Sequence, residues 1–431
     1  MPVTPHSLGL HRLLRYVSPL VRPGLNRGSR RRLREAVNIA DLRAAAEQRV
    51  HSMCFGYLDS GGDDEVTLRR NKDAYSELEM HFQVLAGLQP PLDLSTKIFG
   101  RQVSIPFFAC PTAGNRMFHT EGEAAVARAA LHHDSVYCLS SISTTGIPEV
   151  STILPPSHPK LFQVYVWRDR GLLRDVLAQA REGGFQSLAL TVDFSWYGNR
   201  ERDIRNGFTI PPAYTAKQMW EAAKRPAWTW DFLSTPAYKY ALIQQDVPAD
   251  SLASFINAQV SPAFSWQDAE WLCSEWDGPT AIKGVCRPED AVRALGSGFS
   301  SIWVSNHGGR QLDTSPATID VLPAIREAVG EEVEIILDGG VQRGTDIAKA
   351  LALGADGVGV GKPYLYGLSA GGTEGVVKAL EILRVELDRA MGLLGVATVG
   401  ELKARGRELV RRRAGSSRDG QGARYSRSGI I

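Results

Sequence analysis

The sequence predicts an α/β protein, a (β/α)8 TIM barrel with an N-terminal helical segment and a long insertion after the fourth strand. Three observations favour this fold. From residue 105 onward, short apolar runs without polar alternation take turns with helical stretches, which is typical of parallel strands buried on both faces. One unit, a helix end followed by Gly, an apolar strand and a polar tip, recurs at 180–193, 293–306 and 351–363. Eight such units need about 250 residues, which fits residues 105–395 if one connection is enlarged.

The individual elements follow from the same patterns. Residues 39–49 predict a helix, and residues 55–64 a polar loop that ends it. The eight predicted strands are 105–109, 136–139, 161–166, 187–192, 280–283, 301–304, 333–337 and 357–360.

The two ends of the chain differ from its middle in composition. Between residues 1 and 34 there are eight Arg and no acidic residue, and the sequence from 411 onward is rich in Arg, Ser and Gly. We therefore expect a basic, disordered leader over 1–38, a barrel domain over 39–410 and a disordered basic tail over 411–431. A surface anchor or a mitochondrial address are alternatives for the leader.

Composition excludes several classes of protein. Hydrophobic residues make up 43% and charged residues 22%, as in a globular protein with a full core. A net charge of +2 gives no reason to expect nucleic acid as a partner. The five cysteines have no close pair, which argues against a disulfide framework or a zinc site and favours a reducing compartment such as the cytoplasm.

The enlarged connection, about 205–267, combines aromatic and basic residues, with Trp220, Trp228 and Trp230 near several lysines. Loops of this length are uncommon unless they are functional or disordered. A lid or an oligomer contact is one interpretation. A patch that lies on a membrane surface is the other.

In a barrel of this kind the active site lies at the carboxyl ends of the strands. Each predicted strand is followed by a polar residue or a Gly. In chain order these are Pro111, Thr112, Ala113 and Gly114; Ser140 and Ser141; Gln163 and Tyr165; Thr191 and Asp193; Lys283; His307 and Arg310; Asp338, Gly339 and Gly340; and Gly361 and Lys362.

The stretch after the sixth strand, 305–313, places His307 and Arg310 beside two glycines. A base next to a fixed cation suits removal of a proton from a small acid whose carboxylate the guanidinium holds. Taken alone, the stretch fits better a loop in which both side chains cap carbonyls, and Lys283 alone fits better a solvated lysine.

The Gly-rich tips of the last two strands indicate a phosphate site. Barrels often bind phosphate there through backbone N–H groups and a helix N-terminus. Gly339, Gly340 and Gly361 offer such groups, and Lys362 adds a cation.

Together these motifs resemble the FMN-dependent 2-hydroxy-acid oxidases and dehydrogenases, a family that includes glycolate oxidase, L-lactate dehydrogenase and mandelate dehydrogenase. The similarity spans about residues 57–394. Its most specific part is 305–313, supported by 111–113, 163–165, 190–193, 283–285 and 338–340. Residues 200–266 look most like the membrane-associated dehydrogenases of the family.

The resemblance implies roles for individual residues. His307 would be the base, Asp193 would stabilise its imidazolium, and Lys283 would lie near flavin N1 and O2. The substrate would contact Tyr57, Tyr165, Arg200 and Arg310. FMN would contact Pro111, Thr112, Ala113, Ser140, Gln163, Thr191, Lys283, Ser305, Asp338, Gly339, Gly340, Gln342, Gly361 and Lys362, and no metal is implied.

Three positions depart from the family pattern. Gln342 and Lys362 stand where the family usually has Arg at the FMN phosphate, and Ile142 stands where oxidases often carry Trp. Replacing Arg by Lys loses the bidentate fork. We therefore expect weaker retention of flavin, unless Arg343 or the leader compensates.

By resemblance, the expected activity is oxidation of an L-2-hydroxy acid, lactate or a larger relative, to the 2-keto acid, with electrons passed to a quinone or cytochrome. The alternatives are an oxidase that makes hydrogen peroxide and, from another class, a flavin-poor binding protein without catalysis. A homotetramer or higher oligomer, and a location in the cytoplasm or peripheral to the inner face of the membrane, are also implied.

Overall fold

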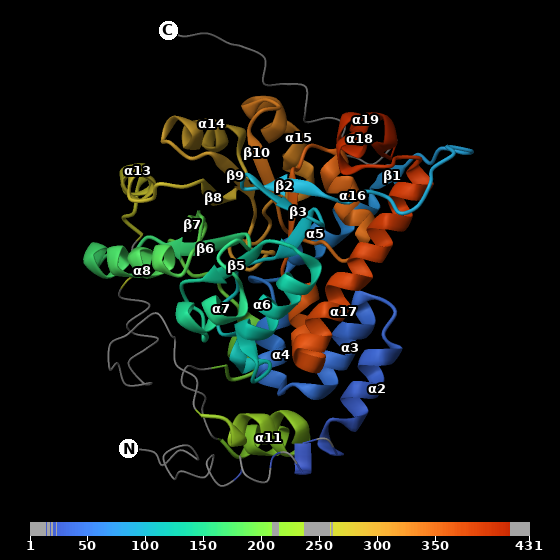
Figure 1. Ribbon diagram of the computed structural model, residues 1–431. Coiled ribbons are helices and arrows are strands. Elements are labelled where there is room, and N and C mark those ends of the chain that lie inside the picture. Colours follow the sequence, from blue (N-terminus) through green and yellow to red (C-terminus); the bar gives the residue numbers. More distant parts are fainter. Residues whose placement is uncertain are drawn as a thin grey trace.

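The computed structural model describes residues 14, 18, 20–22, 24–208, 215–236, 259 and 262–413. Eight parallel strands form one sheet that nearly closes into a barrel, with helices around it (Figure 1). The sheet order is β4-β11-β10-β9-β8-β7-β6-β5, and the outer strands β4 and β5 contact each other. The strands are β4 (Phe107–Ala109), β5 (Tyr137–Ser140), β6 (Lys160–Tyr165), β7 (Ser187–Thr191), β8 (Thr280–Val285), β9 (Ser301–Val304), β10 (Glu334–Leu337) and β11 (Gly357–Val360).

The predicted barrel and its eight strands are confirmed, and no predicted strand end is displaced by more than two residues. The helices between and after the strands are α6 (Gly122–His133), α7 (Ile147–Ile153), α8 (Arg170–Glu182), α13 (Trp266–Ser274), α14 (Pro288–Gly296), α15 (Thr318–Val329), α16 (Gly344–Ala352) and α17 (Lys362–Leu394). Helix α17 is interrupted at Gly371 and Gly372, whose backbone is not helical.

Side chains fill the inside of the barrel, so it is a packed core and not a channel. Trp303 on β9 is fully buried there, and its ring packs edge-on against Phe108 of β4, with centroids 5.4 Å apart. A second, larger cluster lies between the strands and the helices around them. Burial on both faces explains why the strands read as unalternated apolar runs.

Helices α2 (Arg27–Glu35), α3 (Ile39–Arg49), α4 (Ser52–Asp59) and α5 (Val66–Ser76) precede the barrel. The expectation of a disordered leader is wrong for α2, which packs against α3 and α17 and buries Ser29 and Leu33 (Figure 1). The predicted helix 39–49 is confirmed as α3, whose N-terminus is capped by Asn38.

The predicted loop over 55–64 is wrong in its first half, because helix α4 continues to Asp59. Its apolar residues Met53, Phe55 and Leu58 are buried, and this packing outweighs the helix-weakening effect of Gly56. Gly56 itself allows close approach of Asn206, whose side chain would collide with any Cβ at that position.

Among the described residues, two short antiparallel pairings lie outside the barrel sheet. Strand β12 (Val410–Arg412) pairs with β1 (Leu78–Met80) in antiparallel register, and β2 (Thr96–Ile98) pairs with β3 (Arg101–Val103). Short helices α18 (Val399–Ala404) and α19 (Gly406–Leu409) precede β12. The expected disordered tail is therefore wrong for its first residues, 411–412, and residues 414–431 lie outside the described part.

The predicted insertion contains helices where the structure describes it: α9 (Glu201–Arg205) at its start, then α10 (Ala216–Ala223) and α11 (Pro226–Ser234). Trp228 of α11 is buried, and its indole N–H donates to the carbonyl of Met117 at 2.9 Å. On α10, by contrast, Met219 and Trp220 are each 65% exposed. Among the described residues, no helix is both long and apolar enough to cross a membrane.

Candidate active site

A cavity of about 340 Å³ opens at the carboxyl ends of the barrel strands. Almost every predicted site residue lines it. Ser140, Asp193 and Ser305 are the exceptions; they lie directly behind the wall and bind residues that line the cavity. The convergence expected from the strand tips is thus what the barrel produces.

The loop that follows β9 turns sharply at His307. His307, Gly308 and Gly309 all have left-handed backbone angles, with φ of 56°, 66° and 75°. A non-Gly residue in this region is strained, and such strain is found mostly at functional sites. At Gly309 a Cβ would lie 2.6 Å from the backbone nitrogen of Leu68, so only Gly lets the loop approach α5.

His307 and Asp193 form the central pair of the site. Nδ1 of His307 lies 3.0 Å from Oδ1 of Asp193, which follows β7. Burial lowers the pKa of His307, although Asp193 opposes that shift, so the imidazole is neutral near pH 7. Burial acts to raise the pKa of Asp193, but His307 and Lys283 outweigh it and the pKa is lowered.

Gly284 makes room for this carboxylate. Its φ is 111°, and a Cβ there would lie 2.7 Å from the Cβ of Asp193. The second carboxylate oxygen of Asp193, Oδ2, is buried and accepts no hydrogen bond from the described residues. Among the described residues, the carboxylate of Asp193 therefore binds only the side chain of His307. The ring of Phe194 is stacked against the imidazole at a centroid distance of 5.8 Å.

Lys283 belongs to a closed triad with Ser305 and Asp338. Its Nζ donates to Oγ of Ser305 at 2.8 Å and lies 2.9 Å from Oδ2 of Asp338, while Ser305 donates to Oδ1 of Asp338 at 2.7 Å. Burial opposes the charged lysine, but Asp338 and Asp193 outweigh it and raise the pKa of Lys283. The ammonium is thus a fixed positive charge that points into the cavity wall.

A second row of hydrogen bonds runs across β5, β6 and β7. Ser140 donates to Oε1 of Gln163 at 2.8 Å, and the amide Nε2 of Gln163 donates to Oγ1 of Thr191 at 2.8 Å. All three side chains are buried. The row fixes which way the Gln163 amide points, and with it the polar wall of the cavity.

The wall after β4 is 111–113. Thr112 lies 2.5 Å from the hydroxyl of Tyr364, and that hydroxyl donates to the carbonyl of Cys110 at 3.0 Å. These bonds fix residues 110–112 to Tyr364 at the start of α17. Ala113 and Ile142 are the apolar residues beside it that line the cavity.

Two arginines and a tyrosine line the same cavity as His307. The guanidinium of Arg310 is centred 4.8 Å from the ring of Tyr57, and that of Arg200 lies 5.9 Å from the same ring. Nη1 of Arg310 donates to the carbonyls of Tyr57 and Ser60 at 2.6 and 3.0 Å. Burial and the nearby Arg200 lower the pKa of Arg310 to about 10, so it is charged at neutral pH. Tyr165, at the end of β6, lines the same part of the cavity.

Beyond β10 and β11 the cavity is lined by Gly339, Gly340, Gly361, Gln342 and Lys362. Within the described part of the chain, the N–H groups of the three glycines donate no hydrogen bond. The amide Nε2 of Gln342 donates to the neighbouring carbonyl of Val341 at 2.9 Å, so it turns back on its own backbone.

Lys362, at the first turn of α17, is the cation of this end. Burial and the charge of Arg310 lower its pKa to about 7. Arg343 does not assist it: Nη1 of Arg343 lies 2.5 Å from Oε1 of Glu386 on the far part of α17, and Arg343 does not line the cavity. The suggestion that Arg343 compensates for Gln342 is therefore wrong.

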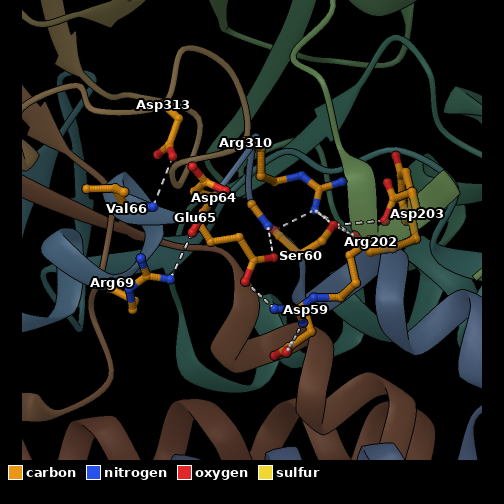
Figure 2. A network of polar contacts seen from close by, with 12 residues as sticks. Asp59, Ser60, Asp64, Glu65, Val66, Arg69, Arg202, Asp203, Arg310 and Asp313 are labelled. Atoms are coloured by element: carbon orange, nitrogen blue, oxygen red, sulfur yellow. Dashed lines mark hydrogen bonds and ion pairs between the residues drawn. The ribbon is translucent and has the colours of Figure 1, made fainter. Parts of the chain in front are cut away.

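Sequence reasoning missed a group of charged residues behind the arginines. Figure 2 shows that Asp59, Ser60, Glu65, Arg202 and Asp203 gather around Arg310. They come from the end of α4, the loop after it and α9, and Asp203 accepts a hydrogen bond from Ser60 at 2.9 Å. The only signal was local: Asp203 and Arg202 follow Arg200 closely, but their partners lie far away in sequence.

Comparison with known proteins gives a consistent result. The sequence pattern described as "FMN-dependent dehydrogenase" matches residues 46–410. Glycolate oxidase 1 of Zea mays is 38% identical over 369 residues, which is 85% of this chain and 94% of the relative. L-lactate oxidase of Nostoc sp. is 37% identical over 369 residues, 85% of this chain and 96% of the relative.

Among solved structures, that of the monotopic membrane protein (S)-mandelate dehydrogenase is similar, with a TM-score of 0.83 and 30% sequence identity. The match covers 88% of this chain and 99% of that one. The relatives therefore include both oxidases and a dehydrogenase.

Proposed function

Because this chain belongs to the FMN-dependent dehydrogenase family, we propose that it oxidises an L-2-hydroxy acid, lactate or a larger relative, to the 2-keto acid and passes the electrons to a quinone or cytochrome. The observation that carries the proposal is that one cavity is lined by both a neutral His307, held by Asp193, and a charged Arg310.

The residues of the cavity fit FMN. Lys362 and the three glycines, whose N–H groups donate no hydrogen bond within the described part of the chain, suit the phosphate. The wall at 111–113 and the Ser140–Gln163–Thr191 row suit the ring. Lys283, whose charge Asp338 supports, would stabilise negative charge on the ring. When bound, FMN supplies the chemistry that accepts the two electrons lost by the substrate.

The substrate carboxylate would be held by Arg310 and Arg200, with hydrogen bonds from Tyr57 and Tyr165. Arg310 keeps Nη2 and Nε free of partners in the described part of the chain, so a carboxylate can take both. This grip would orient the α-carbon and its hydroxyl towards His307.

His307 would take a proton from the substrate, at its hydroxyl or at its α-carbon. The lowered pKa leaves the imidazole neutral and able to accept, and Asp193, which remains ionised, stabilises the imidazolium that forms. The same hydrogen bond fixes the ring orientation, so its other nitrogen faces the cavity.

One anaerobic experiment tests this function. FMN-loaded protein is mixed with L-lactate, L-mandelate or glycolate, and flavin absorbance is followed, with D-lactate as the matched control. We expect bleaching by an L-acid and not by D-lactate. Admitting air or a soluble quinone then separates the acceptors: fast recovery in air favours the hydrogen-peroxide-forming oxidase. No bleaching by any acid would favour the flavin-poor binding protein.

We also propose that the protein contacts a membrane surface peripherally, where it would meet the electron acceptor. Trp196, in the loop after β7, is 74% exposed, and Met219 and Trp220, on α10, are each 65% exposed. Exposed side chains of this kind are suited to a membrane interface. Flotation with anionic vesicles should recover the wild type and lose the Met219→Ser/Trp220→Ser variant. Leu393→Ser, which removes a 63% exposed side chain on α17, is the control and should float like the wild type.

A homotetramer or higher assembly, located in the cytoplasm or at the inner face of the membrane, completes the proposal. Its support is the resemblance to the family. Sedimentation velocity of the FMN-loaded protein would measure the assembly, and a monomer at micromolar concentration would contradict it.

A further inference from the structure

Four cations line the cavity without an acidic partner. Lys72, Arg200, Arg310 and Lys362 have no carboxylate oxygen within 4.0 Å among the described residues, whereas Lys283 is paired with Asp338. Arg200, Arg310 and Lys362 are partly buried, whereas Lys72 is exposed. A partly buried cation without a partner loses hydration and repels its neighbours of like sign. Nearby carboxylates would pair with these cations unless other groups bound them first.

The acids in question are Asp59 and Glu65. Glu65 lies close to Lys362 through the loop at 308–309: Nζ of Lys362 is 3.9 Å from where a Cβ of Gly308 would stand, and Gly309 accepts a hydrogen bond from Gly62, next to the Gly61 that donates to Glu65. The charges of Asp59 and Glu65 act to raise the pKa of Lys362, against the larger lowering by burial and Arg310. Neither pairs with Lys362. Both are held by Arg202, two residues after Arg200: Nη1 lies 2.8 Å from Oδ2 of Asp59, and Nη2 bonds Oε2 of Glu65 (Figure 2).

The two acids depend on Arg202 to different degrees. Asp59 also accepts from Arg43 at 2.7 and 2.8 Å and from the hydroxyl of Tyr366 at 2.7 Å. Glu65 accepts, besides Arg202, only the backbone N–H of Gly61 at 2.9 Å within the described part. Loss of Arg202 would therefore free Glu65 and leave Asp59 paired.

We propose that Arg202 is a positioning residue that holds Glu65 away from Lys362 and thereby keeps this cation available for the phosphate of FMN. The guanidinium can do this because its planar fork binds two carboxylates at once, which a lysine cannot. The proposal rests on the assignment of Lys362 to the cofactor phosphate made above.

The test is the dissociation constant of FMN, measured by titrating flavin-free protein and following quenching of flavin fluorescence. Arg202→Met should raise it about tenfold, as expected for loss of a partly buried charge. Adding Glu65→Gln should restore it to within about threefold, whereas Glu65→Gln alone should change it little, because Arg202 already neutralises that carboxylate. Arg205→Met, on the exposed side of the same helix, is the control and should bind like the wild type.

Two further variants keep the test decisive. Arg202→Lys should fold and give an intermediate constant, because one ammonium can hold only one acid. In a Lys362→Met background, Arg202→Met should have no further effect. The proposal is overturned if Glu65→Gln fails to restore the FMN dissociation constant of Arg202→Met. It is also overturned if Glu65→Gln changes that constant by the same factor with Arg202 as with Met at position 202. If Lys362→Met alone leaves FMN binding unchanged, the phosphate assignment fails instead.

Discussion

The two ends of the cavity are built differently. At the end formed by β7, β8 and β9, the groups proposed for the chemistry have partners in the protein: the neutral His307 binds Asp193, and Lys283 pairs with Asp338. Arg200 and Arg310, which bind no carboxylate among the described residues, are left for the substrate. At the end formed by β10, β11 and α17, Lys362 lacks an acidic partner among the described residues, and Gln342 bonds its own backbone. The base and the lysine of the first end are thus paired within the protein, whereas the polar groups of the second end are left for an anion.

This difference separates chemistry from retention of the cofactor. Preorganised charges lower a reaction barrier because they need no rearrangement during the reaction. A set of unpaired cations instead gains its stabilisation when a phosphate arrives. We therefore expect substitutions at the first end to change rates, and substitutions at the second to change the affinity for FMN.

After removal of His307 itself, the largest effect should come from Asp193→Asn. Without the carboxylate, His307 loses its orientation and its stabilised imidazolium, so the limiting rate of flavin reduction should fall by roughly 10²–10⁴-fold. Stopped-flow absorbance at saturating FMN would measure it, with exposed Asp175→Asn on α8 as control. A rate within threefold of the wild type would remove Asp193 from the mechanism.

Arg310→Met should act next most strongly, and on substrate binding. Hydrogen bonds to a charged group are each worth about 1.5–3 kcal/mol, which corresponds to a rise in KM of roughly 10–150-fold. Steady-state kinetics with an L-2-hydroxy acid would measure the split between KM and kcat. Arg310→Lys retains the charge without the fork and should be intermediate; an unchanged KM would contradict the proposed grip.

At the second end, Gln342→Arg with Lys362→Arg should tighten FMN binding by about tenfold and leave the limiting reduction rate unchanged. The wild type should lose flavin on dilution to nanomolar concentration, as measured by flavin fluorescence. A wild type that keeps stoichiometric flavin there would show that other groups hold the phosphate.

The smallest effect is a pH dependence at the same end. The pKa of Lys362 is lowered to about 7, by burial and Arg310, with Lys72 adding to the shift and Asp59 and Glu65 opposing it. A bound phosphate would raise that pKa. Affinity should therefore be greatest below pH 7 and fall, by at most tenfold per unit, as pH rises through 7 towards the raised value. Lys362→Arg stays charged and should flatten the dependence between pH 7 and 9; a dependence that persists in this variant would exclude Lys362 as its source.

The sequence was sufficient for the barrel and for most of the candidate site. Strands buried on both faces read as apolar runs, and parallel strands bring their carboxyl ends to one side, so residues such as Gln163, Lys283 and His307 had to meet. The roles of these residues stay predictions, because geometry places groups without measuring what they do.

Long-range pairing of charges was beyond the sequence. The partners of Arg202 lie more than a hundred residues away in the sequence. The residues around Arg343 likewise do not indicate that its guanidinium binds Glu386. Helix α2 was missed for a related reason: its Arg-rich composition suggests a solvated arm, and only burial of Leu33 beside Gly371 of α17 reveals a docked helix. Packing overrides composition in such cases.

The most direct test of the account is anaerobic flavin reduction in the wild type and in His307→Gln, both saturated with FMN and mixed with the L-2-hydroxy acid that bleaches the wild type fastest. The account predicts bleaching of the wild type and none of the variant over the same time, with FMN still bound to both. Reduction of His307→Gln at the wild-type rate, or a wild type that no L-2-hydroxy acid reduces, would contradict it.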